Sequence, residues 1–326
     1  MTQDDIIAAL DDCTAPLVVT HTHADLDTVG SAIGLVEALD GNAQVVLPDS
    51  VVPAAKQLVD QVSTPTVAAT AAKPEQADAV VVVDTPSTDR VALVEVNGLN
   101  RPVMLIDHHE TGDLLDYVTA SFIDTNAGST AELVASVIND ADWSLTEAGA
   151  FGLAAGLLDD TGNLTRGTPT EYQLAGDLLA AAGSHWTAIS DLINPQSDRS
   201  ERYACAKAVV RADAYAGADT IIMITSVSGH ESAAANALLA ANADLAVVIS
   251  VRSDEIRVVG RCGDQAGDIH LPDRLFKPLA EQFGGDGGGH AGAGTAKLTT
   301  TDEDAVQEQT LTLVERLIGE ELSLLR

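Results

Sequence analysis

Short runs of Val, Ile and Leu are the feature that most constrains what this sequence can fold into. They predict strands at residues 17–20, 43–47, 79–83 and 102–106. Because these runs are continuous and do not alternate with polar residues, they are typical of strands buried on both faces of a parallel sheet. Helical patterns accompany them at residues 28–39, 129–139, 146–158 and 170–182. This succession of strands and helices predicts an α/β domain with a parallel sheet.

The 326 residues suffice for two domains that each bury a core. A polar segment containing Pro195 interrupts the pattern, so we expect a domain at residues 1–193, a linker at 194–200 and a smaller α/β domain at 201–326. The smaller domain is expected to have helices at residues 201–215, 231–241 and 303–325, and strands at 220–225, 245–251 and 256–259. Residues 284–294 contain seven glycines and are expected to form a loop.

The net charge of −32 is unevenly distributed along the chain. Residues 1–193 carry 5 basic and 29 acidic groups (net −24), and residues 194–326 carry 12 and 20 (net −8). Hydrophobic residues make up 46% of the chain, which excludes a disordered acidic protein. Asp outnumbers Glu and Lys is scarce, which predicts a surface adapted to high salt, as in a halophilic archaeon. At molar salt the Debye length is about 3 Å, so the net charge does not exclude a nucleotide partner.

The sequence predicts a cytoplasmic protein without a membrane partner. No apolar run approaches the roughly 18 residues of a membrane span, and the first residues lack the pattern of a signal peptide. Three scattered cysteines, Cys13, Cys205 and Cys262, form no metal-binding pair and cannot all pair within one chain. These observations favour a reducing compartment.

Histidines and aspartates follow the ends of four predicted elements. They are His21, Asp25, Asp27, Asp84, Asp107, His108, His109 and Asp160. Each group alone is more often a helix cap or an ordinary loop residue. Because ligands bind at the carboxyl ends of the strands of an open parallel sheet, their joint occurrence instead favours one shared site. Mixed Asp and His ligands suit Mn²⁺, and the set is large enough for the two ions that catalyse phosphoryl-oxygen displacement.

The order of these motifs resembles the DHH phosphoesterase superfamily, which includes RecJ-like nucleases. Residues 287–294 (GGGHAGAG) in turn resemble the signature of the DHHA1 domain, which partners one branch of that superfamily. Length and layout are similar to the compact nano-RNase and phosphoadenosine-phosphate phosphatase branch, which also includes cyclic-dinucleotide phosphodiesterases. The resemblance implies an N-terminal DHH catalytic domain, a C-terminal DHHA1 substrate-binding domain and an active site in the cleft between them.

The resemblance also implies a role for each matching residue. One metal ion would be held by His21, Asp25 and Asp84, and a second by Asp27, Asp84, His108 and Asp160. His109 would contact the scissile phosphate, and Asp107 would orient a neighbouring imidazole. The expected catalytic residues are therefore Asp84, Asp107 and His109. The expected ions are Mn²⁺ first, with Mg²⁺ or Co²⁺ as alternatives.

A second set of residues is expected to bind substrate. It comprises His23, Arg252, Ser253, Arg261, Gly288, Gly289 and His290. Glycines let backbone N–H groups approach an anion, although a glycine-rich loop alone is more often only a flexible turn. His23 stands where many relatives have Asn, and Asp159 precedes Asp160 where a small or hydroxyl residue is common. His23 would tune the metal site or contact substrate.

The expected function is Mn²⁺-dependent hydrolysis of phosphoric-ester bonds in short nucleotides. The candidate activities are oligonucleotide exonuclease, phosphatase of 3′,5′-bisphosphorylated nucleosides and cyclic-dinucleotide phosphodiesterase, and relatives often form homodimers. An inorganic pyrophosphatase or exopolyphosphatase and a non-catalytic replication scaffold are the alternatives. The residues leave open the choice between RNA and DNA and the polarity of attack.

Overall fold

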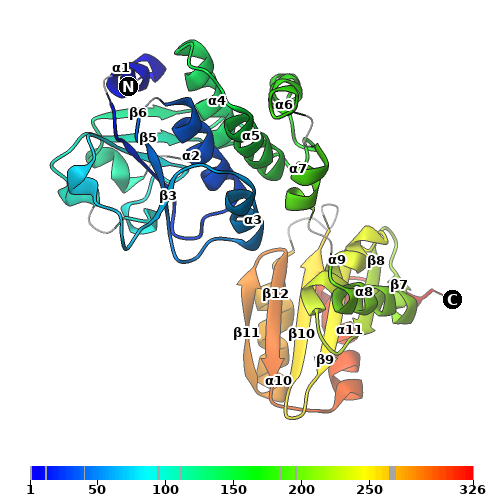
Figure 1. Cartoon of the computed structure of the whole chain (residues 1–326). Coiled ribbons are helices and arrows are strands. Elements are labelled where there is room, and N and C mark those ends of the chain that lie inside the picture. Colours follow the sequence, from blue (N-terminus) through cyan, green and yellow to red (C-terminus); the bar gives the residue numbers. More distant parts are fainter. Residues whose placement is uncertain are drawn as a thin grey trace. The chain divides into compact units, whose positions relative to one another are not determined.

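The protein is described from a computed structural model (Figure 1). It covers residues 2–11, 13–39, 41–93, 96–110, 112–183, 186–194, 197–263 and 269–325. The chain divides into two compact units, Met1–Gln196 and Ser197–Arg326, and the division falls within the polar segment at 194–200. Pro195 itself lies outside the described residues. No described helix combines the length and the apolar character that crossing a bilayer requires.

The first unit is built on a six-stranded sheet in which every pairing is parallel. The strands, in their order across the sheet, are β3 (Thr66–Ala68), β2 (Gln44–Leu47), β1 (Leu17–Val19), β4 (Val80–Val83), β5 (Val103–Asp107) and β6 (Ala120–Ile123). The predicted α/β fold with a parallel sheet is confirmed, whereas β3 and β6 were not anticipated from the sequence. Both are short, and neither contains a continuous Val/Ile run.

Helices cover one face of this sheet. They are α1 (Gln3–Asp11), α2 (Leu26–Ala38), α3 (Pro53–Gln61), α4 (Thr130–Asp140), α5 (Glu147–Asp160), α6 (Pro169–Ala181) and α7 (Trp186–Ile193). Their apolar residues form one core with the side chains that the central strands direct to that face, such as Val81 and Ile106. The opposite face packs against loops and short helical turns in a smaller core. Because both faces of the sheet are buried, the sequences of the central strands are continuously apolar.

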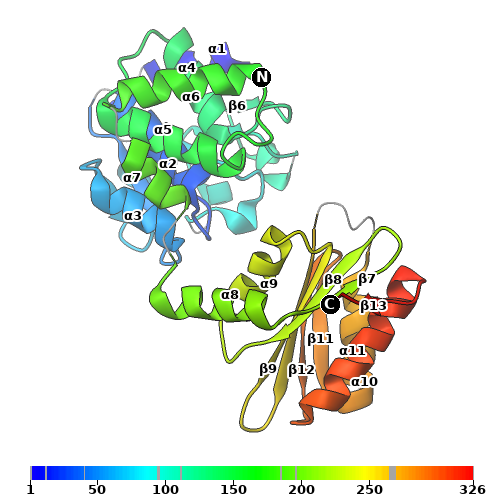
Figure 2. The same ribbon diagram turned by 90° about the vertical axis from the view of Figure 1, so that its right-hand side faces the viewer.

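The second unit is a seven-stranded mixed sheet. Across the sheet, the strands are β11 (Gly285–His290), β12 (Ala293–Leu298), β10 (Ile256–Cys262), β9 (Leu245–Val251), β8 (Ile221–Ser226), β7 (Asp213–Ala216) and β13 (Ser323–Leu324). Helices α8 (Arg199–Arg211) and α9 (Glu231–Ala240) pack on one face, and α10 (Lys277–Phe283) and α11 (Glu303–Ile318) pack on the other (Figure 2). The second sheet agrees with the predicted smaller α/β region.

Three segments of this unit differ from the prediction. The helix expected at 201–215 ends at Arg211, and the chain then forms β7. The closing helix ends at Ile318 because Gly319 adopts a left-handed conformation (φ +83°). The expected glycine-rich loop is wrong, because residues 285–298 form the antiparallel pair β11 and β12.

The glycines of this strand pair make room for an aromatic ring. A Cβ atom on Gly294 would lie 2.7 Å from the ring of Phe276, and one on Gly260 would lie 2.9 Å from it. A Cβ atom on Gly287 would lie 2.6 Å from the carbonyl oxygen of Phe276. Phe276 is fully buried in a π-helical turn, Pro272–Phe276. Close packing against Phe276 therefore explains why glycine occupies positions 260, 287 and 294.

Candidate metal centre

The predicted metal ligands of the first unit meet at the carboxyl ends of its central strands. Strands β1 and β4 are neighbours, and the chain places later strands on opposite sides of them. This is the point where strand order reverses, and ligands of open α/β sheets bind in the crevice there. His21 follows β1, Asp84 follows β4, and His108 follows β5. Topology alone thus brings three of the predicted ligands to one edge.

The first group of candidate ligands is His21, Asp25 and Asp84. The Nε2 atom of His21 lies 3.5 Å from Asp25 Oδ2 and 3.5 Å from Asp84 Oδ2. Asp25 is also the N-cap of α2 and accepts a hydrogen bond from the N–H of Thr28. Burial lowers the pKa of His21, but the two carboxylates outweigh it and raise the pKa to about 9. The imidazole is therefore buried in a strongly negative environment.

The second group is Asp27, His108 and Asp160. The Nε2 atom of His108 lies 3.3 Å from Asp160 Oδ2 and 4.0 Å from Asp27 Oδ2. On the other side of the ring, Nδ1 lies 3.2 Å from the carbonyl oxygen of Ala127, to which it can only donate. This contact fixes the neutral tautomer in which Nε2 is free to bind a metal ion.

Asp84 lies between the two groups. Its Oδ2 faces His21, while its Oδ1 lies 3.7 Å from His108 Nε2 and 3.5 Å from His109 Nδ1. The Thr130 hydroxyl donates to the same Oδ1 over 2.9 Å. Asp84 has a left-handed backbone (φ +65°), a conformation that Asp tolerates better than most side chains. Burial raises the pKa of its carboxyl, despite the nearby histidines.

Asp27 is held by the first turn of α4. Its two carboxylate oxygens accept hydrogen bonds from the N–H groups of Thr130 (2.7 Å) and Ala131 (2.9 Å). These are among the N–H groups that have no partner within a helix, and a carboxylate is favoured there. Even so, burial and the charges of Asp84 and Asp160 raise the pKa of Asp27 well above its ordinary value. The carboxylates repel one another in the absence of a cation.

His109 is hydrogen-bonded to Asp107 through both its backbone N–H and its imidazole. Asp107 is fully buried, and its Oδ1 lies 2.9 Å from His109 Nδ1 and accepts the backbone N–H of His109 over 3.0 Å. The hydrogen bond with Asp107 is the main reason why the pKa of His109 is raised. The side chain of His109 is 43% exposed, in contrast to His21, Asp27 and Asp84, which are buried. Its Nε2 is therefore available to a substrate.

The donors of this site fit divalent cations. The Nε2 atom of His108 is buried and has no hydrogen-bond partner, although carboxylates surround it. Four carboxylates from three segments converge, and no Lys or Arg forms an ion pair with them among the described residues. Buried charges that are neither paired nor bound to a metal are costly. Imidazole and carboxylate donors in this number suit one or two ions of the Mn²⁺ or Mg²⁺ type.

His23 and Asp159, the two residues that differ from the family pattern, lie at the edge of the candidate metal centre. His23 is exposed, and its backbone N–H donates to Nδ1 of His21 over 3.3 Å. Asp159 is exposed, whereas Asp160 turns toward His108. This placement favours Asp160 as the ligand of its motif.

The predicted substrate-binding residues of the second unit do not form one cluster. Arg252 and Ser253 occupy the turn between β9 and β10, where the Arg252 side chain donates to Glu231 and Ser253 donates to Asp254. Arg261 lies near the other end of β10, five residues beyond Ile256, which for a strand is roughly 17 Å. Gly288, Gly289 and His290 end the edge strand β11, close to Arg261 through β12.

Several residues that support the candidate sites were not anticipated. Thr130 and the Ala127 carbonyl hold ligands through hydrogen bonds that no sequence motif marks. The Arg166 guanidinium donates to the backbone carbonyl of Asp160. Arg257 and Lys297, which face each other on β10 and β12, line a cavity of about 510 Å³ together with Arg261. Of this last group, only Arg261 was among the residues predicted to bind substrate.

The fold and the site together define an α/β domain with a parallel sheet and a candidate metal centre at the carboxyl ends of its central strands. Residues 16–157 match the family model described as the DHH family, N-terminal domain. The first unit of the chain therefore contains a segment that matches the DHH family, in agreement with the family predicted from the sequence. The resemblance of the second unit to the DHHA1 domain stays a prediction.

Proteins of known sequence or structure resemble nearly the whole chain. An uncharacterized protein of Methanocaldococcus jannaschii is 28% identical over 285 residues, which cover 85% of each chain. The cyclic-di-AMP phosphodiesterase GdpP of Geobacillus thermodenitrificans is 26% identical and covers 90% of this chain, which spans 46% of GdpP. A crystal structure of an exopolyphosphatase-related protein from Bacteroides fragilis has a TM-score of 0.64 at 19% identity and covers 98% of this chain and 97% of its own. This last likeness concerns the fold.

Proposed function

We propose that this protein is a phosphoesterase that uses two divalent ions to hydrolyse short nucleotides. The position of Asp84 carries the proposal, because its two oxygens face two groups of candidate ligands at once. A carboxylate placed in this way is suited to bridge two ions. Bound ions would activate water and neutralise the charge that develops on the phosphoryl oxygens.

The chain's own residues would bind and orient the reacting groups. His21, Asp25 and Asp84 would hold one ion, and Asp27, Asp84, His108 and Asp160 the other. The preference of mixed His and Asp donors makes Mn²⁺ the first choice, with Mg²⁺ and Co²⁺ as alternatives. Asp107 would keep the Nδ1 proton of His109 in place, so that His109 presents Nε2 to the phosphate or to the leaving oxygen.

The substrate class is proposed from the second unit and from the relatives. The name of GdpP describes a cyclic-di-AMP phosphodiesterase, which supports a dinucleotide as substrate. In the second unit, Arg257, Arg261 and Lys297 line one cavity beside the glycine strand, and these cations suit a phosphate. We therefore propose linear and cyclic dinucleotides, short oligonucleotides and 3′,5′-bisphosphorylated nucleosides as substrates, with His290, Gly288 and Gly289 among the residues that contact them.

A substrate panel tests this proposal. The purified chain is incubated with Mn²⁺ and with cyclic-di-AMP, linear pApA, adenosine 3′,5′-bisphosphate, pyrophosphate or tripolyphosphate, and the products are separated by chromatography. We expect turnover of at least one of the nucleotides, loss of turnover in EDTA and a loss of more than about a hundredfold in Asp84→Asn. Asp116→Asn removes the charge of an exposed aspartate elsewhere in the first unit and is expected to behave like the parent.

Turnover of pyrophosphate or tripolyphosphate alone would instead identify an inorganic phosphatase. If no compound is cleaved while the protein still binds Mn²⁺, or if Asp84→Asn retains full activity, the proposed two-ion hydrolysis is wrong. The second result would exclude the shared role of Asp84.

A further inference from the structure

Helix α8 is basic in an otherwise acidic chain. It carries Arg199, Arg202, Lys207 and Arg211 against a single acidic residue, Glu201. Tyr203, Lys207 and Arg211 follow one another at intervals of four residues, so they form one stripe along the helix. With a net charge of −32 for the chain, such a concentration of cations on one helix calls for an explanation.

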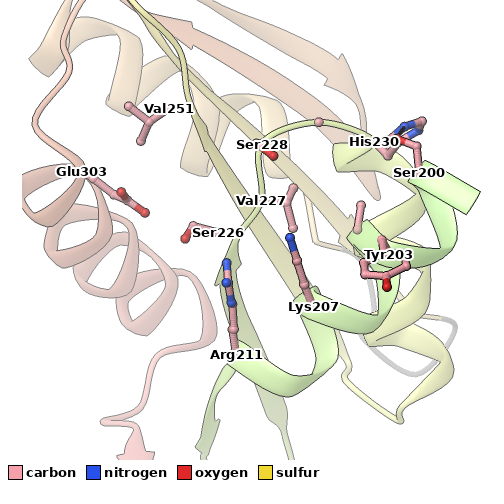
Figure 3. A pocket seen from close by; sticks show the side chains of 12 residues that line it. Ser200, Tyr203, Lys207, Arg211, Ser226, Val227, Ser228, His230, Val251 and Glu303 are labelled. Atoms are coloured by element: carbon pink, nitrogen blue, oxygen red, sulfur yellow. Dashed lines mark hydrogen bonds between the residues drawn. The ribbon is translucent and has the colours of Figure 1, made fainter.

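This stripe forms one wall of a cavity of about 490 Å³ in the second unit. Lys207 and Arg211 point from α8 toward Ser226 and Val227, at the carboxyl end of β8 (Figure 3). The loop that follows β8 adds the Ser228 hydroxyl, and Val251 lines the cavity from the carboxyl end of the parallel neighbour β9. The cavity therefore lies where ligands bind in α/β sheets.

Among the residues that the structure describes, Lys207 and Arg211 have no protein counter-ion. Neither Lys207 nor Arg211 forms a salt bridge within the described part of the chain, whereas Arg252, Lys277 and Lys297 each do. The one acidic side chain that lines the cavity is Glu303, at the start of α11. An anion between the cations and the two serine hydroxyls would be favoured by charge and by hydrogen bonding.

An exposed aromatic ring lies next to the cations. Tyr203 is 56% exposed, and Lys207 Nζ lies 6.0 Å from the centre of its ring. On the same helix, the Arg199 guanidinium is 5.6 Å from that centre. Planar rings and guanidinium groups are the surfaces on which nucleobases stack. A ligand with a phosphate and a flat aromatic group would use both parts of this wall.

We propose that this cavity binds a nucleoside phosphate. Its phosphate oxygens would contact Lys207, Arg211 and the hydroxyls of Ser226 and Ser228, while its base would stack against Tyr203. Glu303 suits a sugar hydroxyl or an amino group of the base, which donate hydrogen bonds, and it disfavours a ligand that is anionic throughout. This site belongs to the second unit by itself and contains none of the candidate metal ligands.

Isothermal titration calorimetry on the full-length protein in EDTA tests the proposal without involving the metal centre. We use AMP as the probe at about 0.15 M KCl, with inorganic phosphate and adenosine as the two partial ligands. AMP is expected to bind more tightly than either. Lys207→Ala and Arg211→Ala are each expected to weaken AMP binding about tenfold or more, because each removes a charged partner of the phosphate. Tyr203→Ala should weaken it severalfold.

Matched variants separate a local effect from a general one. Lys277→Ala removes a similarly exposed cation from α10, outside the cavity, and should leave the AMP affinity unchanged. Asp84→Asn should also leave it unchanged, so loss of hydrolysis and loss of this site are distinguishable. Circular dichroism checks that each variant is folded, and Lys207→Gln provides a second test of the charge. The proposal is overturned if AMP does not bind at about 1 mM, if Lys207→Ala and Arg211→Ala bind it as tightly as the parent, or if phosphate binds as tightly as AMP.

Discussion

Thr130 connects the two groups of candidate ligands through a pair of hydrogen bonds. Its hydroxyl donates to Asp84, and its backbone N–H donates to Asp27. Thr130→Val keeps the shape and the N–H but removes the hydroxyl, so Asp84 loses a fixed orientation. We expect the apparent affinity for Mn²⁺, measured from the metal dependence of kcat/KM, to fall about 10- to 100-fold.

Thr130→Ser restores the hydroxyl and should restore metal affinity. Thermal unfolding of the metal-free proteins provides the control for packing, because a merely structural role would lower the unfolding temperature without changing the metal dependence. An unchanged metal dependence in Thr130→Val would show that this hydroxyl does not position Asp84.

The histidines of the centre predict how the metal-free protein responds to pH. The pKa values of His21 and His108 are raised from 6.5 to about 9 by neighbouring carboxylates, against the effect of burial. A raised histidine pKa stabilises the folded state below the unfolded value of 6.5, and this contribution is lost as pH rises toward 9. In EDTA, the unfolding temperature of the first unit should therefore fall across this range. With saturating Mn²⁺ the fall should be much smaller, because the ligands are then deprotonated at both ends of the range.

The ligand residues could be predicted from the sequence because each follows a recognisable strand or helix. What holds them could not be predicted in the same way. Ala127 acts through its backbone carbonyl, and Thr130 is one of many threonines that begin a helix. Both residues reach the ligands because α4 and the loop before it lie at the ends of β4 and β5. These segments are far apart in the sequence, so no local pattern indicates that they meet.

At the scale of elements, close packing of α2 against α5 sets the distance between two candidate ligands. Asp27 lies on α2, Asp160 ends α5, and a Cβ atom on Gly30 would lie only 2.2 Å from the carbonyl oxygen of Gly152. Gly30→Ala must push the helices apart, which we expect to lower the free energy of unfolding by about 1–3 kcal/mol and to weaken metal binding.

Gly176→Ala is the matched control for this effect. A Cβ atom on Gly176, in the middle of α6, would meet no atom within 4 Å. This substitution should be neutral or stabilise the protein by roughly 0.5–1 kcal/mol, because Ala favours a helix more than Gly does. Chemical denaturation measures both variants. If Gly30→Ala matches Gly176→Ala in stability, the helices have more freedom than their packing indicates.

The glycines of β11 allow packing and substrate contact to be separated. A Cβ atom on Gly287 would clash with Phe276, whereas one on Gly288 would meet nothing within 4 Å. We expect Gly287→Ala to destabilise the second unit by about 1–3 kcal/mol. Gly288→Ala should leave stability nearly unchanged and, if the backbone here approaches the substrate, raise KM. Equal unfolding temperatures for the two variants would contradict the packing role of Gly287.

This segment also illustrates why part of the fold could not be predicted. Seven glycines in eleven residues are typical of a loop, and nothing local in the sequence indicates a strand. The pairing arises because Phe276, which precedes the segment, fills the space left by Gly260, Gly287 and Gly294. By contrast, the Val runs of the first unit determine its central strands locally, since each is buried on both faces.

At the scale of the whole molecule, the charge distribution opposes the proposed substrate. The first unit carries 5 basic and 29 acidic groups, a net charge of −24, and two divalent ions would neutralise only part of it. The cations that could bind phosphate are concentrated in the second unit, on α8 and along β10. An approaching nucleotide therefore experiences long-range repulsion and short-range attraction. These two effects respond to salt with opposite signs.

The sign of the salt dependence of kcat/KM decides which effect dominates. Long-range repulsion is screened as the Debye length shortens, so we expect kcat/KM for linear pApA to rise severalfold between about 0.05 and 0.5 M KCl. Bis(4-nitrophenyl) phosphate carries a single charge and should respond less if the protein cleaves it. Circular dichroism over the same range separates this effect from salt-dependent folding. A fall in kcat/KM with salt, as for proteins whose phosphate contacts release counter-ions, would show that the local cations control association.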